Sequence, residues 1–140
     1  MSRAAQMLET YPGEIRFDAK ALAECIASCL ECAQTCTACA DACLAEDRVA
    51  ELRSCITHNA NCADVCDTMT RMLLRMNGMD PQVMMSMMQT TIVMCRACSA
   101  ECMMHAEMSE HCRMCAMACD QAVMAMEKMM SAMSEAMPMA

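Results

Sequence analysis

The chain has 140 residues, a formal net charge of −8 and almost no aromatic side chains, since Tyr11 and Phe17 are the only two. This length suffices for one domain with its own core, which must be built from Cys, Met, Ala and Leu. The negative charge and the lack of aromatic stacking platforms argue against a nucleic-acid partner. No uncharged stretch is long enough to cross a bilayer, so no membrane partner is expected.

The sequence predicts an all-α fold, because two glycines and three prolines leave little material for the turns of a sheet. We expect an N-terminal segment over residues 1–17, with a short helix at 2–10, and a domain over 18–140. Its helices are predicted at 19–45, 48–76, 81–105 and 110–135. The boundary signals are Asp18, Asn77-Gly78, Asp80-Pro81, Ser109 and Pro138. Four helices joined by short turns predict an antiparallel four-helix bundle.

Cysteines occupy the positions of these helices that should face the bundle axis. In residues 25–43 they recur with successive steps of 4, 3, 4, 3 and 4, the spacing that keeps one stripe of a helix against its neighbours. The other helices continue the pattern, so the bundle is predicted to have a Cys-lined core. The cysteines are Cys25, Cys29, Cys32, Cys36, Cys39, Cys43, Cys55, Cys62, Cys66, Cys95, Cys98, Cys102, Cys112, Cys115 and Cys119.

A disulfide framework explains these cysteines poorly. Such frameworks belong to small secreted domains with loop-borne cysteines, whereas these lie on helical stripes and are odd in number. Antiparallel threading instead places Cys43, Cys55, His105 and Cys112 at one end of a sulfur-lined tube. Methionines lie at the other end, beside Cys25. Neutral thiols pack as small apolar groups, so we expect the metal-free bundle to be folded.

Once deprotonated, such a core becomes a bank of soft ligands. Thiolates favour Cu(I), zinc and iron–sulfur clusters among biological metals. Zinc knuckles normally sit on turns, and iron–sulfur runs often end in Cys-Pro, which is absent from this sequence. Cu(I) accepts two or three sulfur ligands as well as His and Met, so Cys-x-x-x-Cys pairs on a helix suit it. Several Cu(I) ions per chain are therefore predicted.

The Cys pairs and the segment from His105 to Cys112 resemble the bacterial copper storage proteins, most closely their cytosolic branch. The resemblance covers about residues 18–128. It implies a four-helix bundle that stores many Cu(I) ions on Cys thiolates, with His and Met near the open end, and a homotetrameric assembly. Copper donor or acceptor proteins are then the expected protein partners. Export signals are not evident near Met1, which favours a cytoplasmic location.

Three further residues are candidate ligands at the open end. His105 falls on the inner stripe and is preferred, His111 lies one step off it, and Met108 continues the inner stripe of the fourth helix. Loading is expected to begin at this end. His58 is expected at the surface, and inner residues Asn59 and Thr91 are expected to hydrogen-bond to backbone carbonyls or to each other.

The methionines allow two interpretations. Of 23 Met, 21 lie in residues 69–139, and many are off the stripe, where filling irregular space is the better explanation. For the stripe members, packing and Cu(I) ligation both remain open. These are Met76, Met84, Met126, Met129 and Met133.

Two other functions fit the cysteines less well. One is a zinc- or cadmium-binding thiol sink, which should keep zinc when Cu(I) is supplied. The other is a thiol redox enzyme using Cys95–Cys98 or Cys112–Cys115, each of which has an Arg in its spacer. Neither pair is expected at a helix N-terminus after a strand, and a redox pair leaves the other cysteines unexplained. We therefore expect storage and no catalytic residues.

Overall fold

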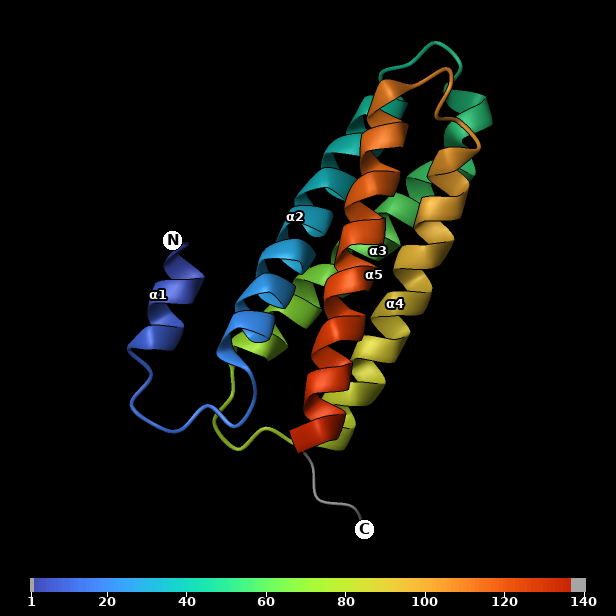
Figure 1. Ribbon diagram of the computed structural model, residues 1–140. Coiled ribbons are helices and arrows are strands. Elements are labelled where there is room, and N and C mark those ends of the chain that lie inside the picture. The colour runs from blue at the N-terminus through green and yellow to red at the C-terminus, as the bar shows by residue number, and fades with distance from the viewer. Residues whose placement is uncertain (1, 137–140) are drawn as a thin grey trace.

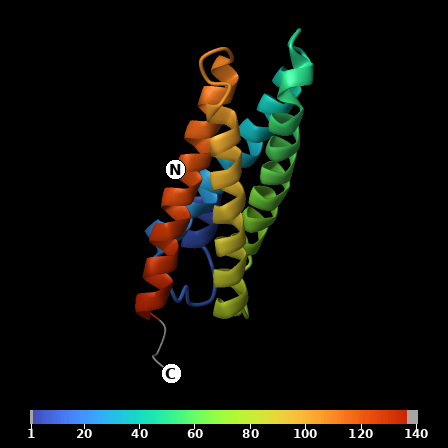
Figure 2. The same cartoon turned by 90° about the vertical axis from the view of Figure 1, so that its right-hand side faces the viewer.

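The computed structural model describes residues 2–136, and all regular structure in that range is helical (Figure 1). The elements are α1 (Arg3–Glu9), α2 (Ala19–Leu44), the 3-10 turn η1 (Val49–Leu52), α3 (Arg53–Leu74), α4 (Pro81–Met103) and α5 (Glu110–Ala136). Helices α2 to α5 run up and down in turn, and α5 closes the bundle by packing on both α4 and α2 (Figures 1 and 2). The predicted all-α bundle and its short N-terminal helix are confirmed.

Two aspartates start helices as predicted. A carboxylate oxygen of Asp18 accepts hydrogen bonds from two N–H groups in the first turn of α2, at 2.9 and 3.3 Å. Asp80 does the same for α4 at 3.0 and 3.5 Å, and Pro81 follows at the first helical position. These bonds satisfy N–H groups that have no partner within the helix. Gly78, with φ of +70°, provides the left-handed residue in the turn between α3 and α4.

Two helix boundaries differ from the prediction. The helix predicted over 48–76 begins with η1, and the α-helix spans only Arg53–Leu74. The tighter turn directs Leu52 into the core, where it is fully buried. The helix predicted over 81–105 ends at Met103, because short-range turns over residues 104–108 return the chain to α5. The predicted stop signal Pro138 lies outside the described residues.

The core has two parts. All 15 cysteines are buried, none more than 2% exposed, and we call them the thiol core. Toward the start of α2 the thiol core gives way to buried methionines with Leu22 and Leu73, which we call the methionine end. Its methionines are Met69, Met84, Met88, Met126, Met129 and Met133. The opposite end, where α2 leads into η1 and α4 into α5, is the histidine end.

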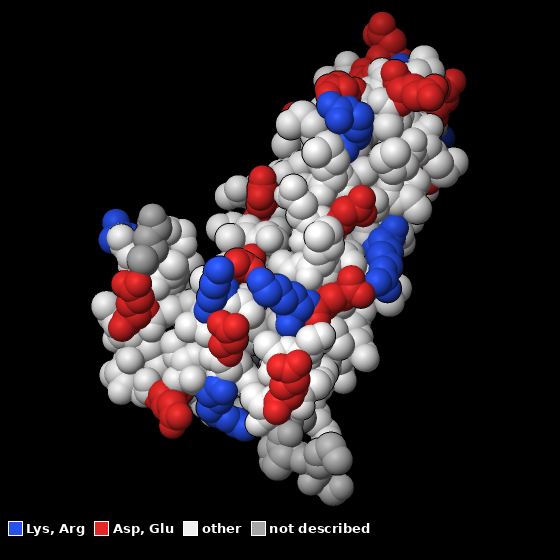
Figure 3. Space-filling view, in the orientation of Figure 1, with Lys and Arg blue, Asp and Glu red and all other residues white. Residues whose placement is uncertain are grey.

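Charged side chains lie on the outside of the bundle on the face that Figure 3 shows, and no Asp, Glu, Lys or Arg of the described residues is buried. Among the described residues two exposed ion pairs join one helix to another, Arg96 with Glu127 at 3.1 Å and Lys128 with Glu24 at 3.0 Å. Exposed pairs of this kind contribute at most about 1 kcal/mol, so the core rather than the surface holds the helices together. Over residues 2–136, none of the helices combines the length and the apolar character that a membrane span needs.

Candidate metal centre

The middle of the bundle brings thiols from all four long helices into contact. The Sγ of Cys32 lies 3.8 Å from the Sγ atoms of both Cys62 and Cys119. Cys62 in turn lies 3.7 Å from Cys95, and Cys36 lies 3.5 Å from Cys115. A disulfide requires about 2 Å between sulfurs, and all 15 cysteines are free thiols.

These thiols form groups with the dimensions of metal sites. Five groups occur among the described residues in which all potential ligand atoms lie within 4.8 Å of one another. Two thiolates about 2.3 Å from one metal ion are about 3.8–4.0 Å apart in tetrahedral or trigonal geometry, which matches the contacts above. The groups are Cys32–Cys62–Cys66–Cys95, Cys32–Cys36–Cys62–Cys119, Cys36–Cys98–Cys115–Cys119, Cys39–Cys43–His111–Cys112 and Cys39–Cys102–Cys115.

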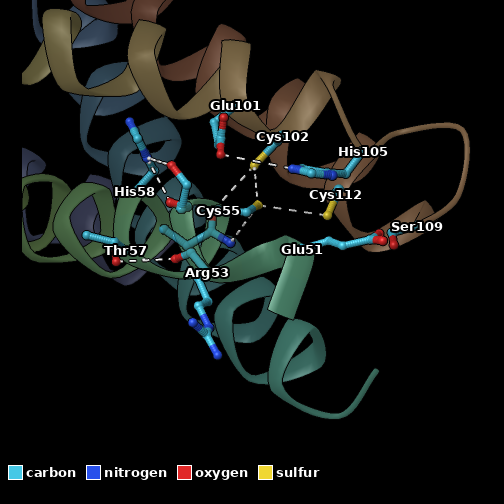
Figure 4. Close-up of polar contacts among 12 residues, drawn as sticks. Glu51, Arg53, Cys55, Thr57, His58, Glu101, Cys102, His105, Ser109 and Cys112 are labelled. Carbon is cyan, nitrogen blue, oxygen red and sulfur yellow. Dashed lines mark hydrogen bonds and ion pairs between the residues drawn. The ribbon is translucent and has the colours of Figure 1, made fainter. Parts of the chain in front are cut away.

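Neighbouring groups share sulfurs. Cys32 and Cys62 belong to two groups each, and Cys36 and Cys119 connect the second group to the third. A shared thiolate can bridge two ions, so the groups form one continuous array rather than separate closed sites. Only Cys25, Cys29 and Cys55 fall outside every group, although Cys55 lies 3.6 Å from Cys102 and 4.0 Å from Cys112 (Figure 4).

At the histidine end, His111 joins the array. Its Nδ1 lies 3.3 Å from the Sγ of Cys39 and 3.6 Å from that of Cys112. Its Nε2 lies 2.7 Å from a carboxylate oxygen of Glu46, which can only accept a hydrogen bond when ionised. The Nε2 atom therefore carries the proton, and in the neutral ring the Nδ1 lone pair is directed toward the thiols. A carboxylate behind the ring is the usual support for a metal-binding histidine.

Glu46 is itself held in place from the α4–α5 connection. Ser109, which is buried, donates a 2.6 Å hydrogen bond to the same oxygen, and Arg48 donates to the Ser109 hydroxyl at 2.8 Å. The hydrogen bond from Ser109 is the main cause that lowers the pKa of Glu46, and with the contact of His111 and the charge of Arg48 it outweighs the effect of burial. Burial alone would lower the pKa of His111, but the contacts with Cys39 and Glu46 outweigh it and raise the pKa. Glu46 is not recognisable as a site residue from the sequence, because a Glu-Asp pair after a helix indicates only a break.

The structure places His105 and Met108 differently from His111. Both lie in the turns after α4, where the predicted helix no longer continues. His105 is part of none of the five groups, and its Nε2 lies 4.0 Å from the carboxylate of Glu101 (Figure 4). Met108 is 73% exposed. His58 is only partly buried on the outside of α3, where its Nδ1 lies 2.8 Å from the Ser54 carbonyl oxygen.

The two inner polar residues have different roles. Thr91 donates to the carbonyl oxygen of Met87 at 2.7 Å, as predicted. For Asn59 the prediction of a backbone partner is wrong. Its side-chain oxygen accepts hydrogen bonds from the thiols of Cys98, Cys115 and Cys102, at 3.1, 3.2 and 3.4 Å. No sequence pattern indicates this role, which depends on thiols from two other helices converging on one amide.

Burial and mutual contact set the protonation of the thiols. Burial, with the nearby Cys39, raises the pKa of Cys43 to about 11. The hydrogen bond from Cys102 lowers the pKa of Cys55, but the contact with Cys39 and burial together raise it to about 12. At neutral pH Cys43 and Cys55 are therefore neutral thiols that lose a proton when a metal ion binds.

Comparisons with known proteins agree with this geometry. A family model described as copper storage protein matches residues 18–131. The chain is similar to the copper storage protein of Streptomyces lividans solved with 10 copper equivalents, at 44% identity and a TM-score of 0.90, over 92% of this chain and 98% of that chain.

Two related structures give similar values. A cytosolic copper storage protein from Streptomyces lividans, solved with five coppers, is 46% identical with a TM-score of 0.79, over 80% of this chain and 93% of that chain. A Streptomyces lividans variant in which a histidine is replaced by alanine is 45% identical with a TM-score of 0.82, over 84% and 98% of the two chains. Comparison with curated proteins gave no match.

Proposed function

Because this chain belongs to the copper storage protein family, we propose that it stores several Cu(I) ions on the thiolates of its core. The observation that carries the proposal is the array of five thiol groups, buried and joined through shared cysteines. Relatives of similar fold have been solved with five and with 10 copper equivalents, which supports a comparable multi-ion load here. The proposed ligands are the 15 cysteines, with His111 and, at the rim, His105 and Met108.

The shared sulfurs favour Cu(I) over zinc. Zinc prefers four ligands in a closed set, whereas Cu(I) is satisfied by two or three sulfurs and tolerates bridging. Among the described residues no carboxylate, the hard ligand type of the chain, is buried in the core, so carboxylates do not compete there for a soft ion. A zinc or cadmium sink remains the second candidate, because Cys32, Cys62, Cys66 and Cys95 form one complete four-thiol group.

The histidine end is the proposed route of access. A surface groove between α2 and α5 is lined by Cys39, His111 and Met114, so an ion can meet the first thiol of the array from solvent. The exposed Met108 and the partly buried His105 lie in the adjoining turns and offer soft, weak ligands before the ion reaches Cys43 and Cys112.

A redox enzyme is disfavoured by the position of its candidate pairs. Cys95–Cys98 and Cys112–Cys115 are fully buried within helices, where a protein disulfide substrate has no access. We assign storage to residues 18–140, because residues 1–17 contain no cysteine. The cytoplasm is the proposed location, in line with the cytosolic relative.

A homotetramer is the proposed assembly. Exposed apolar residues on the outer faces of α4 and α5, such as Val93 at 67% and Met124 at 68%, provide surface for such contacts. Analytical ultracentrifugation should give four times the chain mass.

Anaerobic titration of the reduced protein with Cu(I), against a chromophoric chelator, tests the storage function. Free thiols are counted at each step, and zinc is present in a parallel series. Storage predicts uptake of several equivalents, thiols disappearing in proportion, and displacement of zinc by Cu(I). Zinc retained against Cu(I) would instead establish the zinc sink, and turnover of a disulfide substrate would establish a redox enzyme.

A further inference from the structure

The thiol core continues into the methionine end along a repeat of seven residues. One level of the core consists of Cys32, Cys62, Cys95 and Cys119, joined by contacts of 3.7 and 3.8 Å. Moving seven residues toward the start of α2 and α4, and toward the end of α3 and α5, leads to the same end of the antiparallel bundle (Figure 1). Two helical turns preserve the face of a helix to within about 20°. The resulting level is Cys25, Met69, Met88 and Met126.

Every member of this second level carries sulfur and is fully buried. Cys25, Met69, Met88 and Met126 each have 0% exposure and belong to one continuous core. The level between the two contains Cys29 and Cys66, and Cys66 lies 3.5 Å from Cys95. Cys29 and Cys66, both fully buried, therefore place sulfur between the four-thiol group and the methionine end.

Packing alone does not call for methionine at these three positions. Leucine has nearly the same volume and already occupies inner positions at 22, 52 and 73, where it is fully buried. Three thioethers on three helices, at one level with a thiol, form a ligand set that leucine does not offer. Thioether and thiolate sulfurs select soft ions such as Cu(I).

We propose that Cys25, Met69, Met88 and Met126 form a mixed thiolate–thioether site for one monovalent soft cation, the innermost site of the store. This inference rests on the proposed storage function, because the ion reaches the site through the thiol core. One thiolate and one monovalent cation sum to zero charge, so the complete site is neutral. A neutral site suits the apolar surroundings of the methionine end, where an uncompensated charge would be expensive to bury.

Methionine methyl NMR tests the site in the intact protein. Chains labelled at the methionine methyl carbons are titrated under reducing conditions with Ag(I), a redox-inert analogue of Cu(I), and thiols are counted in parallel. Single Met→Leu variants assign the signals. The methyl signals of Met69, Met88 and Met126 should shift at saturation, whereas those of exposed Met7, Met103 and Met104 should not. Complete thiol loading without these shifts would overturn the proposal and leave storage intact, whereas no thiol loading would contradict storage itself.

A matched pair of triple variants measures the stoichiometry with Cu(I). Combining Met69→Leu, Met88→Leu and Met126→Leu should lower uptake by about one equivalent, since leucine removes the ligands with little change in volume. The control combines Met7→Leu, Met103→Leu and Met104→Leu and should keep full uptake. Circular dichroism of both metal-free variants checks the fold. Equal uptake by both variants would overturn the site.

Discussion

The thiol core and the methionine end are built from the same four helices but differ in what their sulfurs can do. Thiols are small and ionisable, so the thiol core changes from neutral to anionic as ions bind. Thioethers are larger and never ionise, and with Leu22 and Leu73 they keep the same apolar surface buried at any metal load. Full burial of each such side chain contributes about 1.5–3 kcal/mol. The methionine end can therefore sustain the fold while the thiols of the thiol core become thiolates.

The largest expected effect is on metal uptake from the thiol core. The double variant Cys32→Ala and Cys62→Ala removes two sulfurs that each belong to two ligand groups. Cu(I) uptake in the chelator titration should fall by several equivalents, while helix content is kept. Met129→Leu, a change within the methionine end but outside the proposed site, should leave uptake unchanged. Equal losses of Cu(I) uptake from the two variants would mean that the thiol core and the methionine end do not differ in metal binding.

The free energy of unfolding of the metal-free protein should depend more on the methionine end than on the thiol core. Met129→Ala leaves a cavity at the methionine end and should lower the free energy of unfolding by about 2–5 kcal/mol. Cys36→Ala, at an equally buried position of the thiol core, removes a single sulfur and should lower it by about 1 kcal/mol. Denaturant unfolding under reducing conditions measures both. A larger loss from Cys36→Ala would mean that the thiol core dominates the fold.

Asn59 should contribute to the stability of the fold but not to the number of Cu(I) ions bound. Asn59→Ala removes the oxygen that accepts from three buried thiols, and should lower the free energy of unfolding by about 1–3 kcal/mol. Because the amide is no ligand in the proposed store, Cu(I) stoichiometry should be kept. Asn59→Asp is the matched control, since it retains an acceptor but buries a potential charge. A reduced Cu(I) stoichiometry in Asn59→Ala would show that the amide is needed to order the ligands.

The smallest effect is a pH dependence at the histidine end. The raised pKa of His111 gives stability that is fully present below the unfolded-state value of about 6.5 and lost as pH rises through the folded-state pKa. The lowered pKa of Glu46 gives stability that is present above about 4.3 and lost as pH falls through its folded-state pKa. The free energy of unfolding of the wild type should therefore exceed that of His111→Gln by more at pH 6 than at pH 8.

This pH effect should be below about 1 kcal/mol, because both side chains are partly exposed to solvent. Denaturant unfolding of the metal-free proteins at the two pH values measures it. If wild type and His111→Gln differ in stability by the same amount at both pH values, folding does not change the protonation of the Glu46–His111 pair.

Periodicity was enough to predict the bundle, since a stripe of Cys at steps of three and four determines which face of each helix is buried. It failed where tertiary contacts decide. The choice between His105 and His111 depends on turns over residues 104–108, which move His105 off the helical stripe while Glu46 orients His111 toward Cys39. Similarly, the role of Asn59 requires thiols from α4 and α5, and no local pattern encodes that meeting.

Anomalous diffraction at the copper edge, from crystals of the Cu(I)-loaded protein, tests the central claim most directly. Storage in the core predicts a row of copper peaks inside the bundle, between sulfurs of α2, α3, α4 and α5, with little movement of the helices from the metal-free state. Copper bound mainly on the outer surface, with the core thiols free of metal, would contradict it.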